Sequence, residues 1–183
     1  RTVHQYGIDY ISIDCAGQST LTFEGSTITG LLPAAAHSGR YSFWSNRGDE
    51  SNMNLTREFD FTDVSGKIEF TYATWYDIEE DWDYLYLEVS EDGKTWEMIQ
   101  TPSGTDTDPT GQNYGWAFTG QTSGWIEETV DLSAYAGRKV QIRVDYVTDA
   151  AVNGEGLLLD DVRVDAINYT EDFENGDGGW LAQ

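Results

Sequence analysis

The chain has 183 residues, enough for one domain with a substantial hydrophobic core, and a formal net charge of −23 at pH 7. This charge argues against nucleic acid and anionic membranes as partners, and no apolar run is long enough to cross a bilayer. The single Cys15 excludes an internal disulfide, but many exported bacterial proteins lack disulfides. The charge favours a cation-rich setting such as the outside of a cell, so we expect a secreted, extracellular protein that neither binds nucleic acid nor inserts into a membrane.

Short segments with alternating apolar residues follow one another along the chain, separated by turns rich in Gly, Asp and Asn. They are predicted as strands at residues 8–14, 20–24, 41–45, 55–61, 68–74, 83–90, 96–99, 125–132, 139–147 and 157–164. A short helical turn is predicted at residues 133–137, and no segment has a helical period longer than two turns. Many short strands without intervening helices predict an all-β antiparallel sandwich, and we expect jelly-roll topology.

The most regular of these patterns is a predicted hairpin in the middle of the chain. Leu85, Leu87 and Val89 alternate with polar and aromatic residues, so one face of their strand is predicted to be buried. The segment Glu91-Asp-Gly-Lys94 then supplies Asp-Gly for a tight turn. An acidic loop precedes the hairpin, which raises the question of whether its carboxylates bind a metal.

The two ends of the chain carry similar sequences. Ile8-Asp-Tyr-Ile-Ser-Ile-Asp14 resembles Leu159-Asp-Asp-Val-Arg-Val-Asp165, and Phe23-Glu24 recurs as Phe173-Glu174. Both matches have an offset of about 150 residues, which favours tandem modules over coincidence. We expect one module at residues 20–167, the closing strand of a preceding module at residues 1–15, and the start of a following module or a tail at residues 168–183.

Asp160 is the strongest single candidate for a metal ligand. Strand alternation places it on the apolar face of its strand, and a buried carboxylate needs a cation or several hydrogen-bond donors. If the first and last strands of the module pair, Glu24 lies close to Asp160. Together with carbonyl groups near residues 38–40, these acids would form an all-oxygen site suited to Ca²⁺. The alternative is that each carboxylate accepts backbone N–H groups.

Three other acids are weaker candidates for metal ligands. Asp49 lies in a polar turn, while Glu79 and Asp83 lie in the acidic loop and share a face if that loop is extended. Their spacing loosely resembles the paired carboxylates of some β-sandwich glycosidases, so a glycoside hydrolase is a less favoured alternative. A second cation site or a hydrogen-bonded acidic turn is the preferred interpretation.

The loop at residues 101–124 is long, rich in Thr, Gly and Ser, and contains Tyr114 and Trp116. Exposed aromatic rings in such a loop can stack against sugar rings, which makes a carbohydrate-binding module the main alternative function. The simpler interpretation is that these rings fold the loop onto the sandwich.

No motif for catalysis is present. The sequence contains no His-Glu-x-x-His zinc pair, no Gly-x-Ser-x-Gly elbow and no Cys pair, and its only histidines are His4 and His37. We therefore assign no catalytic residue and expect a chain that is not itself an enzyme.

Several motifs occur in an order that identifies a family resemblance. They are His37–Leu55, Trp75–Tyr84, Val89–Trp96, Gly124-Trp125, Val130–Gly137, Tyr146–Asp149 and Leu159–Val162. This order resembles the non-catalytic β-sandwich region of secreted metallopeptidases of the immune inhibitor A type. The Phe-Glu and Leu-Asp-Asp-Val motifs are shared more loosely with calcium-stabilised, carbohydrate-binding jelly rolls and with MAM-like adhesion domains.

The resemblance implies an extracellular accessory domain that follows a zinc peptidase or peptidase-like domain. Such a domain would contact neighbouring domains of the same polypeptide, and it could engage a protein or glycan at a cell surface. By similarity, Glu24 and Asp160 align with the calcium-binding acids of the jelly-roll group, which implies Ca²⁺ as a structural cofactor. Tyr10 replaces the second Asp in the N-terminal copy of the motif, so that copy is not expected to bind in the same way.

Overall fold

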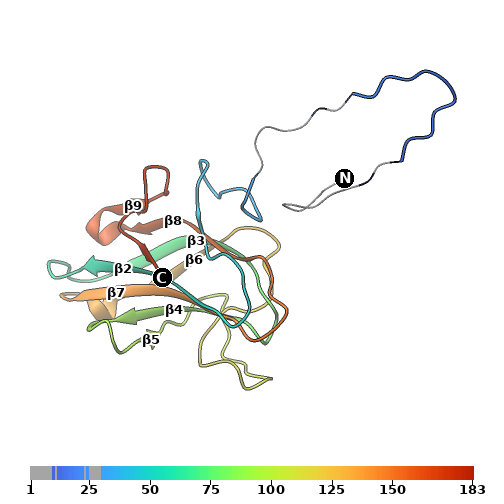
Figure 1. Cartoon of the computed structure of the whole chain (residues 1–183). Helices are drawn as coiled ribbons and strands as arrows, with labels where there is room; N and C mark the ends of the chain where they lie inside the picture. The colour runs from blue at the N-terminus through green and yellow to red at the C-terminus, as the bar shows by residue number, and fades with distance from the viewer. Residues whose placement is uncertain (1–9, 11, 23, 25–29) are drawn as a thin grey trace. The chain divides into compact units, whose positions relative to one another are not determined.

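The computed structural model describes residue 10, residues 12–22, residue 24 and residues 30–183 (Figure 1). The chain divides into two compact units, Arg1–Leu31 and Leu32–Gln183. In the first unit the described residues of the expected strands at 8–14 and 20–24 are not in β-structure, while residues 8, 9, 11 and 23 lie outside the described residues. Alternation alone does not form a strand, because backbone groups must also pair with a neighbour. The module boundaries expected at residues 20 and 167 stay predictions.

The second unit is built from strands and two short 3₁₀ turns. The strands are β1 (Phe43–Trp44), β2 (Asn52–Asp60), β3 (Glu69–Asp77), β4 (Tyr84–Ser90), β5 (Glu97–Met98), β6 (Ile126–Asp131), β7 (Lys139–Val147), β8 (Gly156–Val164), β9 (Tyr169–Glu171) and β10 (Leu181–Ala182). The 3₁₀ turns are η1 (Ser133–Tyr135) and η2 (Asp165–Ile167). The short helical turn expected after residue 132 is therefore confirmed. No helix in the described part of the chain has the length and hydrophobicity needed to span a bilayer.

The strands form two antiparallel sheets, which confirms the predicted sandwich. The order is β1-β8-β3-β6 in the first sheet, with β9 also paired to β8, and β10-β2-β7-β4-β5 in the second. Successive strands from β1 to β4 alternate between the sheets, and so do β6, β7 and β8 (Figure 1). This interleaved order of eight strands is that of a jelly roll.

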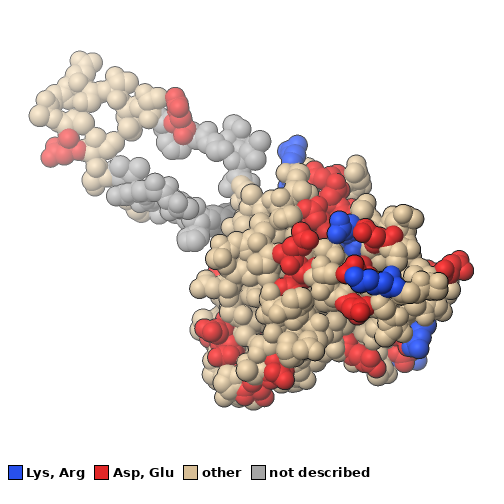
Figure 2. All heavy atoms as spheres, turned by 180° about the vertical axis from the view of Figure 1, so that it is seen from behind, with Lys and Arg blue, Asp and Glu red and all other residues tan. Residues whose placement is uncertain are grey.

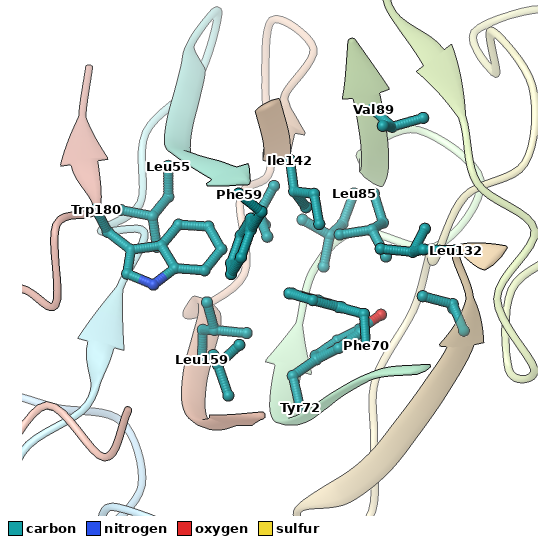
Figure 3. Close-up of a cluster of buried hydrophobic side chains, with 14 of the residues drawn as sticks. Leu55, Phe59, Phe70, Tyr72, Leu85, Val89, Leu132, Ile142, Leu159 and Trp180 are labelled. Carbon is teal, nitrogen blue, oxygen red and sulfur yellow. The ribbon is translucent and has the colours of Figure 1, made fainter. Parts of the chain in front are cut away.

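The core lies between the two sheets. Leu55, Phe59 and Ile142 point from the second sheet toward Phe70 and Leu159 of the first (Figure 3). As predicted from alternation, the inward side chains of β4 belong to this core, and those of β7 do too; they are Leu85, Leu87, Val89, Val140, Ile142, Val144 and Tyr146. Burial of this apolar surface at about 25 cal/mol per Å² is the main term that stabilises the sandwich.

One strand departs from simple alternation, and this changes the predicted environment of Asp160. The β3–β8 register shifts between Thr71 and Ala73, and Asp161 opposite this shift has φ of 46°. This β-bulge resets the side-chain alternation of β8. Leu157 and Leu159 belong to the core cluster before the bulge, and Val162 and Val164 belong to it after the bulge. Asp160 is therefore buried on the face of β8 opposite to Val162. The prediction that it lies among the core side chains is wrong.

The loops that connect β1 to β2, β3 to β4 and β7 to β8 meet at one end of the sandwich. Antiparallel pairing places the start of β2 and the start of β4 beside the end of β7, with Asn52 and Tyr84 both opposite Val147. The hairpin predicted at residues 91–94 lies at the other end of β4, and it joins β4 to β5 as expected. The first set of loops therefore brings acids from distant parts of the sequence together.

Acidic side chains outnumber basic ones on the surface, as the composition requires. Figure 2 shows one face of the molecule, on which the few Lys and Arg side chains mostly adjoin carboxylates. Ion pairs of this kind include Lys139 with Asp60 at 2.8 Å and Arg47 with Glu155 at 2.8 Å. Exposed pairs like these contribute little to stability.

Candidate cation site

Three carboxylates converge at the end of the sandwich where the loops meet. One oxygen from each of Glu79, Asp83 and Asp149 lies within 4.8 Å of the other two. Glu79 and Asp83 come from the β3–β4 loop, and Asp149 follows β7. Asp83 is only 1% exposed. Glu79 and Asp83 are two of the weaker metal candidates predicted from the sequence, and the fold joins them to Asp149, which was not predicted.

The β3–β4 loop folds into a tight turn that holds Glu79 and Asp83 on the same side. The N–H of Asp83 donates to the carbonyl oxygen of Glu79 at 3.1 Å. Thr119 supports the turn from the long loop, since its hydroxyl donates to the Glu79 carbonyl at 3.3 Å and accepts the N–H of Asp81 at 2.8 Å. The turn is therefore held by a backbone hydrogen bond and by the Thr119 hydroxyl, neither of which uses the carboxylates of Glu79 and Asp83.

Asp149 is positioned by the β1–β2 loop. Its carbonyl oxygen accepts the N–H of Glu50 at 2.5 Å, and its own N–H donates to Asp83 Oδ1 at 3.0 Å. The neighbouring Thr148 donates its hydroxyl to the carbonyl oxygen of Gly48 at 2.8 Å. Asp49, the third weak candidate from the sequence, lies in this same loop and accepts a hydrogen bond from Asn153 at 2.7 Å.

The electrostatics of the site disfavour three negative charges. Burial raises the pKa of the Glu79 carboxyl group, and the charges of Asp149, Asp83 and Asp49 raise it further. Burial also raises the pKa of Asp83, although hydrogen bonds from the Asp149 amide and the Tyr146 hydroxyl oppose the rise. One oxygen of Glu79, Oε2, is buried without a hydrogen-bond partner.

No Lys or Arg in the described part of the chain compensates these charges, because none forms an ion pair with Glu79, Asp83 or Asp149. The ion pairs that Lys and Arg do form involve other carboxylates; they are Arg47–Glu155, Lys67–Glu69, Arg138–Glu91, Lys139–Asp60, Arg143–Glu88, Arg143–Asp145 and Arg163–Asp165. Hard oxygen donors with uncompensated charge are the ligand type that Ca²⁺ prefers.

The same arrangement is poorly suited to glycoside hydrolysis. A catalytic carboxylate must reach the glycosidic bond, yet Asp83 is buried and its two oxygens accept hydrogen bonds from Asp149 and Tyr146.

His37 is not placed to activate a serine nucleophile, because its ring contacts Asp161 at 2.5 Å while the Ser38 hydroxyl donates to the same carboxylate at 2.7 Å. In a catalytic triad the serine would instead donate to the histidine.

Comparison with known proteins identifies the family. The family model described as the immune inhibitor A-like MAM domain matches residues 9–178. The chain belongs to the immune inhibitor A-like MAM domain family. This confirms the resemblance seen in the sequence.

Two of the three curated relatives reported for this MAM domain are peptidases by name, and the third is an immune inhibitor A. The chain is 31% identical over 158 residues to the pre-pro-metalloprotease PrtV of Vibrio cholerae, which covers 86% of this chain and 16% of that protein. It is 30% identical over 142 residues to immune inhibitor A of Bacillus thuringiensis, covering 74% of this chain and 19% of that protein. Bacillopeptidase F of Bacillus subtilis is 30% identical over 118 residues, covering 64% of this chain and 7% of that protein. The chain thus spans less than a fifth of the length of each relative.

The first-choice metal candidates predicted from the sequence, Glu24 and Asp160, have different environments in this MAM domain. Glu24 is exposed and belongs to the first compact unit. Asp160 is fully buried in the second, and its carboxylate accepts the N–H groups of His37 at 2.9 Å, Ser38 at 3.2 Å and Asp161 at 2.8 Å. These donors match the alternative given for Asp160, and its pairing with Glu24 stays a prediction.

A second carboxylate, that of Glu174, accepts N–H groups from the same segment as Asp160. The sequence analysis did not identify Glu174 as a candidate. Glu174 Oε1 accepts the N–H groups of Arg40 at 2.6 Å and Tyr41 at 2.7 Å. Glu174 is the counterpart of Glu24 in the internal repeat, so the repeat contained the signal that could have identified it.

The aromatic residues of the long loop differ in exposure. Trp116 is partly buried, and its indole N–H donates to the carbonyl oxygen of Thr101 at 3.0 Å, so it ties the loop down. Tyr114 is 70% exposed and its ring stacks on Tyr86, with centroids 6.1 Å apart. Of the two predicted ligand-binding aromatics, Tyr114 is the more exposed.

Proposed function

We propose that this chain is a non-catalytic, calcium-stabilised extracellular accessory domain of a metallopeptidase-like protein. It would hold neighbouring domains of the same polypeptide in position, or help them engage a protein or glycan at a cell surface. The family match supports this, since it is to the MAM domain and the matched region is a small part of each peptidase relative. The acidic composition is compatible with an extracellular setting rich in cations.

The observation that carries calcium stabilisation is the convergence of Glu79, Asp83 and Asp149 without a compensating Lys or Arg among the described residues. Ca²⁺ binds oxygen ligands at about 2.3–2.6 Å, so two ligands on opposite sides of the ion are roughly 5 Å apart. The three oxygens lie within 4.8 Å of one another, close enough for one Ca²⁺ ion to contact all three. A bound Ca²⁺ would offset two of the three negative charges and give Glu79 Oε2 a partner.

The test is a thermal melt of the purified chain in Ca²⁺, in Mg²⁺ and in chelator. At a Ca²⁺ concentration 100 times the dissociation constant, binding stabilises the folded state by about 2.7 kcal/mol. For a chain of this size that corresponds to an increase in Tm of about 5–10 °C. Mg²⁺ should give a smaller increase, because it requires a tighter octahedral shell. Equal melts in Ca²⁺ and in chelator would contradict the proposal.

Carbohydrate binding through the loop at residues 101–124 is the second candidate, supported by the exposed Tyr114 ring. Stacking on a sugar would use the face of Tyr114 that does not contact Tyr86. Pull-down of this chain on insoluble polysaccharides tests the idea. Retention that disappears in Tyr114→Ala but persists in Trp82→Ala, a substitution at another exposed ring, would support it; no retention on any polysaccharide would exclude the candidate for those ligands.

A further inference from the structure

A groove crosses the outer face of the first sheet. It extends over β9, β8, β3 and β6, which follow one another in this sheet (Figure 1). Its volume is about 580 Å³, which is the size of a ligand-binding pocket. The residues that line it include Thr71, Ala73, Glu127, Asp161, Glu171 and Asp172. The groove contains none of the carboxylates of the candidate cation site, so its occupancy does not depend on calcium binding there.

Small side chains of β3 form the floor of the groove. Phe70 and Tyr72 point into the core, so the alternate residues Thr71 and Ala73 point to the outer face. The bulge in β8 turns Asp161 toward the same face, where it lines the groove. A low floor of this kind leaves room for a ligand between the side chains of the flanking strands.

Carboxylates stand on both walls of the groove. On one side Glu127 of β6 lies opposite Ala73 of β3. On the other side Glu171 of β9 lies opposite Val162 of β8, and Asp172 follows it. Three strand spacings of about 4.8 Å separate β6 from β9, so the two walls are about 14 Å apart. One metal ion cannot bridge this distance, because its oxygen ligands lie within roughly 5 Å of one another.

In the described part of the chain, no ion pair compensates three of the carboxylates in the groove. They are Glu127, Glu171 and Asp172. Asp161 differs, since its carboxylate contacts the His37 ring. Arg163 also lines the groove, but its guanidinium pairs with Asp165 at 3.4 Å. A ligand with positive charge on two opposite sides would therefore complement the two walls.

The carboxylates on the walls have oxygens available to hydrogen-bond donors. Glu171 Oε1 accepts the Phe173 N–H at 2.8 Å, and Asp172 Oδ1 accepts the Glu174 N–H at 3.2 Å. These bonds hold two carboxylates in place, while their second oxygens accept no hydrogen bond from the described residues. Glu127 is exposed, and neither of its oxygens accepts a hydrogen bond from these residues. Such oxygens form strong, charge-assisted hydrogen bonds with Arg and Lys.

We propose that this groove docks an extended segment of a partner protein that carries two consecutive basic residues. Successive side chains of an extended chain point to opposite sides, so one basic side chain would reach Glu127 and the next would reach Glu171 or Asp172. Arg suits these positions best, because its planar guanidinium can bind a carboxylate through two hydrogen bonds. The net charge of −23 would also steer a basic partner toward the chain.

A dibasic segment fits this groove better than a glycan does. No Phe, Tyr or Trp is among the described residues that line it, so it lacks a ring on which a sugar could stack. The one dibasic sequence of this chain, Arg138-Lys139, already pairs with Glu91 and Asp60. The segment is therefore assigned to a partner protein.

The test is an NMR titration of the full chain with capped synthetic peptides at physiological salt, which screens non-specific attraction. The peptide Gly-Ser-Arg-Arg-Ser-Gly should shift the amide signals of Thr71 and Ala73 saturably. The peptide Gly-Arg-Ser-Arg-Ser-Gly has the same charge, but it presents both Arg side chains on one side. It should bind about 2- to 5-fold more weakly, as expected for the loss of one exposed ion pair. The first peptide with Gln in place of both Arg residues should produce no saturable shift.

Glu127→Gln/Asp172→Asn removes one charge from each wall and keeps the shape of both side chains. It should weaken binding of the Arg-Arg peptide roughly 3- to 30-fold, since two exposed ion pairs are lost. It should also abolish the preference over the Arg-Ser-Arg peptide. Glu58→Gln/Asp106→Asn is the matched control, because it removes the same charge at exposed positions outside the groove, and it should bind as wild type does. The Ile142 amide in β7 reports that each variant stays folded.

The proposal is wrong if the control variant weakens binding as much as the groove variant, because the attraction would then reflect overall charge alone. Equal binding of the Arg-Arg and Arg-Ser-Arg peptides to wild type would also contradict it, as would saturable shifts with the Gln peptide. Shifts of the Thr71 and Ala73 amides with cellulose or chitin oligosaccharides, but not with the Arg-Arg peptide, would instead assign the groove to a glycan.

Discussion

The N–H of Asp83 donates a hydrogen bond to the carbonyl oxygen of Glu79 at 3.1 Å, closing a turn that holds both carboxylates beside Asp149. The turn is local, but its consequence is electrostatic. Two acids four residues apart face the same place, and the fold adds a third from another loop. Folding without a cation must therefore overcome the repulsion among these charges.

Glu79→Gln should remove most of the gain in Tm that Ca²⁺ produces. The substitution keeps the shape of the side chain but removes one charge and weakens one ligand, while the hydrogen bonds of the Asp83 carboxylate stay in place. In chelator the variant should melt slightly above wild type, because one repulsive charge is gone. Thermal melts in Ca²⁺ and in chelator measure both effects.

The matched control for this substitution is Glu80→Gln. Glu80 is adjacent in sequence and exposed, so its substitution should leave the response to Ca²⁺ within about 1 °C of wild type, as expected for a surface change. An equal loss in both variants would show that Ca²⁺ acts through the overall negative charge.

The stabilisation by Ca²⁺ should shrink as the pH falls. The pKa values of Glu79 and Asp83 are raised in the folded state without a cation. The folded state therefore takes up protons before the unfolded state does, and in chelator its stability rises as the pH falls from about 8 toward the ordinary carboxyl pKa near 4. Ca²⁺ requires the deprotonated carboxylates, so protons compete with it.

Melts at pH 8, 6.5 and 5, each with Ca²⁺ and with chelator, give the difference in Tm at each pH. Groups outside the site titrate in both conditions and cancel in this difference. A difference that stays constant over this range would place the bound Ca²⁺ away from Glu79 and Asp83.

Asp145→Asn should change the pH dependence of stability independently of Ca²⁺. Asp145 is 6% exposed, its Oδ1 has no hydrogen-bond partner, and burial raises its pKa to about 6 although Arg143 opposes the rise. Wild type should lose on the order of 3 kcal/mol of stability through this group as the pH rises from 4 to 8. The variant lacks this loss, so its stability relative to wild type should increase over the same range. Urea unfolding at both pH values measures the difference, and parallel curves would refute the assignment.

Trp180→Ala should destabilise the second unit strongly. Trp180 is 2% exposed and contacts Phe59, and truncation of a buried Trp to Ala costs about 3–5 kcal/mol. Trp82→Ala is the control, since Trp82 is 43% exposed and its loss should cost less than about 1 kcal/mol. Denaturant unfolding compares the two variants. Similar costs would mean that Trp180 does not contribute to the core in solution.

The sheet architecture was predictable because alternation is a local property of each strand. The pattern of Leu85, Leu87 and Val89 gave the correct inward face, and Asp92-Gly93 gave the correct hairpin. The face of Asp160 relative to Val162 was not predictable in this way. It depends on a bulge at Asp161, which inserts one residue and reverses the alternation that follows.

The candidate cation site was predictable only in its local half. Glu79 and Asp83 lie four residues apart in an acidic loop, so their sequence spacing suggested a shared role. Asp149 is distant in sequence, and it joins them because antiparallel pairing of β4 with β7 brings the ends of these strands together. The order in which the strands pair must be known before a distant acid such as Asp149 can be selected. Once jelly-roll order is assumed, the acid directly after β7 becomes a natural candidate.

The pairing of β10 with β2 has a mechanical consequence. Beyond Trp180 the chain is held to β2 by a short antiparallel pair, in which Asn54 and Gln183 exchange two hydrogen bonds of 2.8 Å. Tension applied through Gln183 would break these hydrogen bonds one after another before it acts on the buried Trp180 side chain. A neighbouring domain that pulls on this end would detach the edge strand at low force while the jelly roll behind it stays intact. The segment that contains β10 would thus extend under tension, up to the force at which the Trp180 side chain leaves the core.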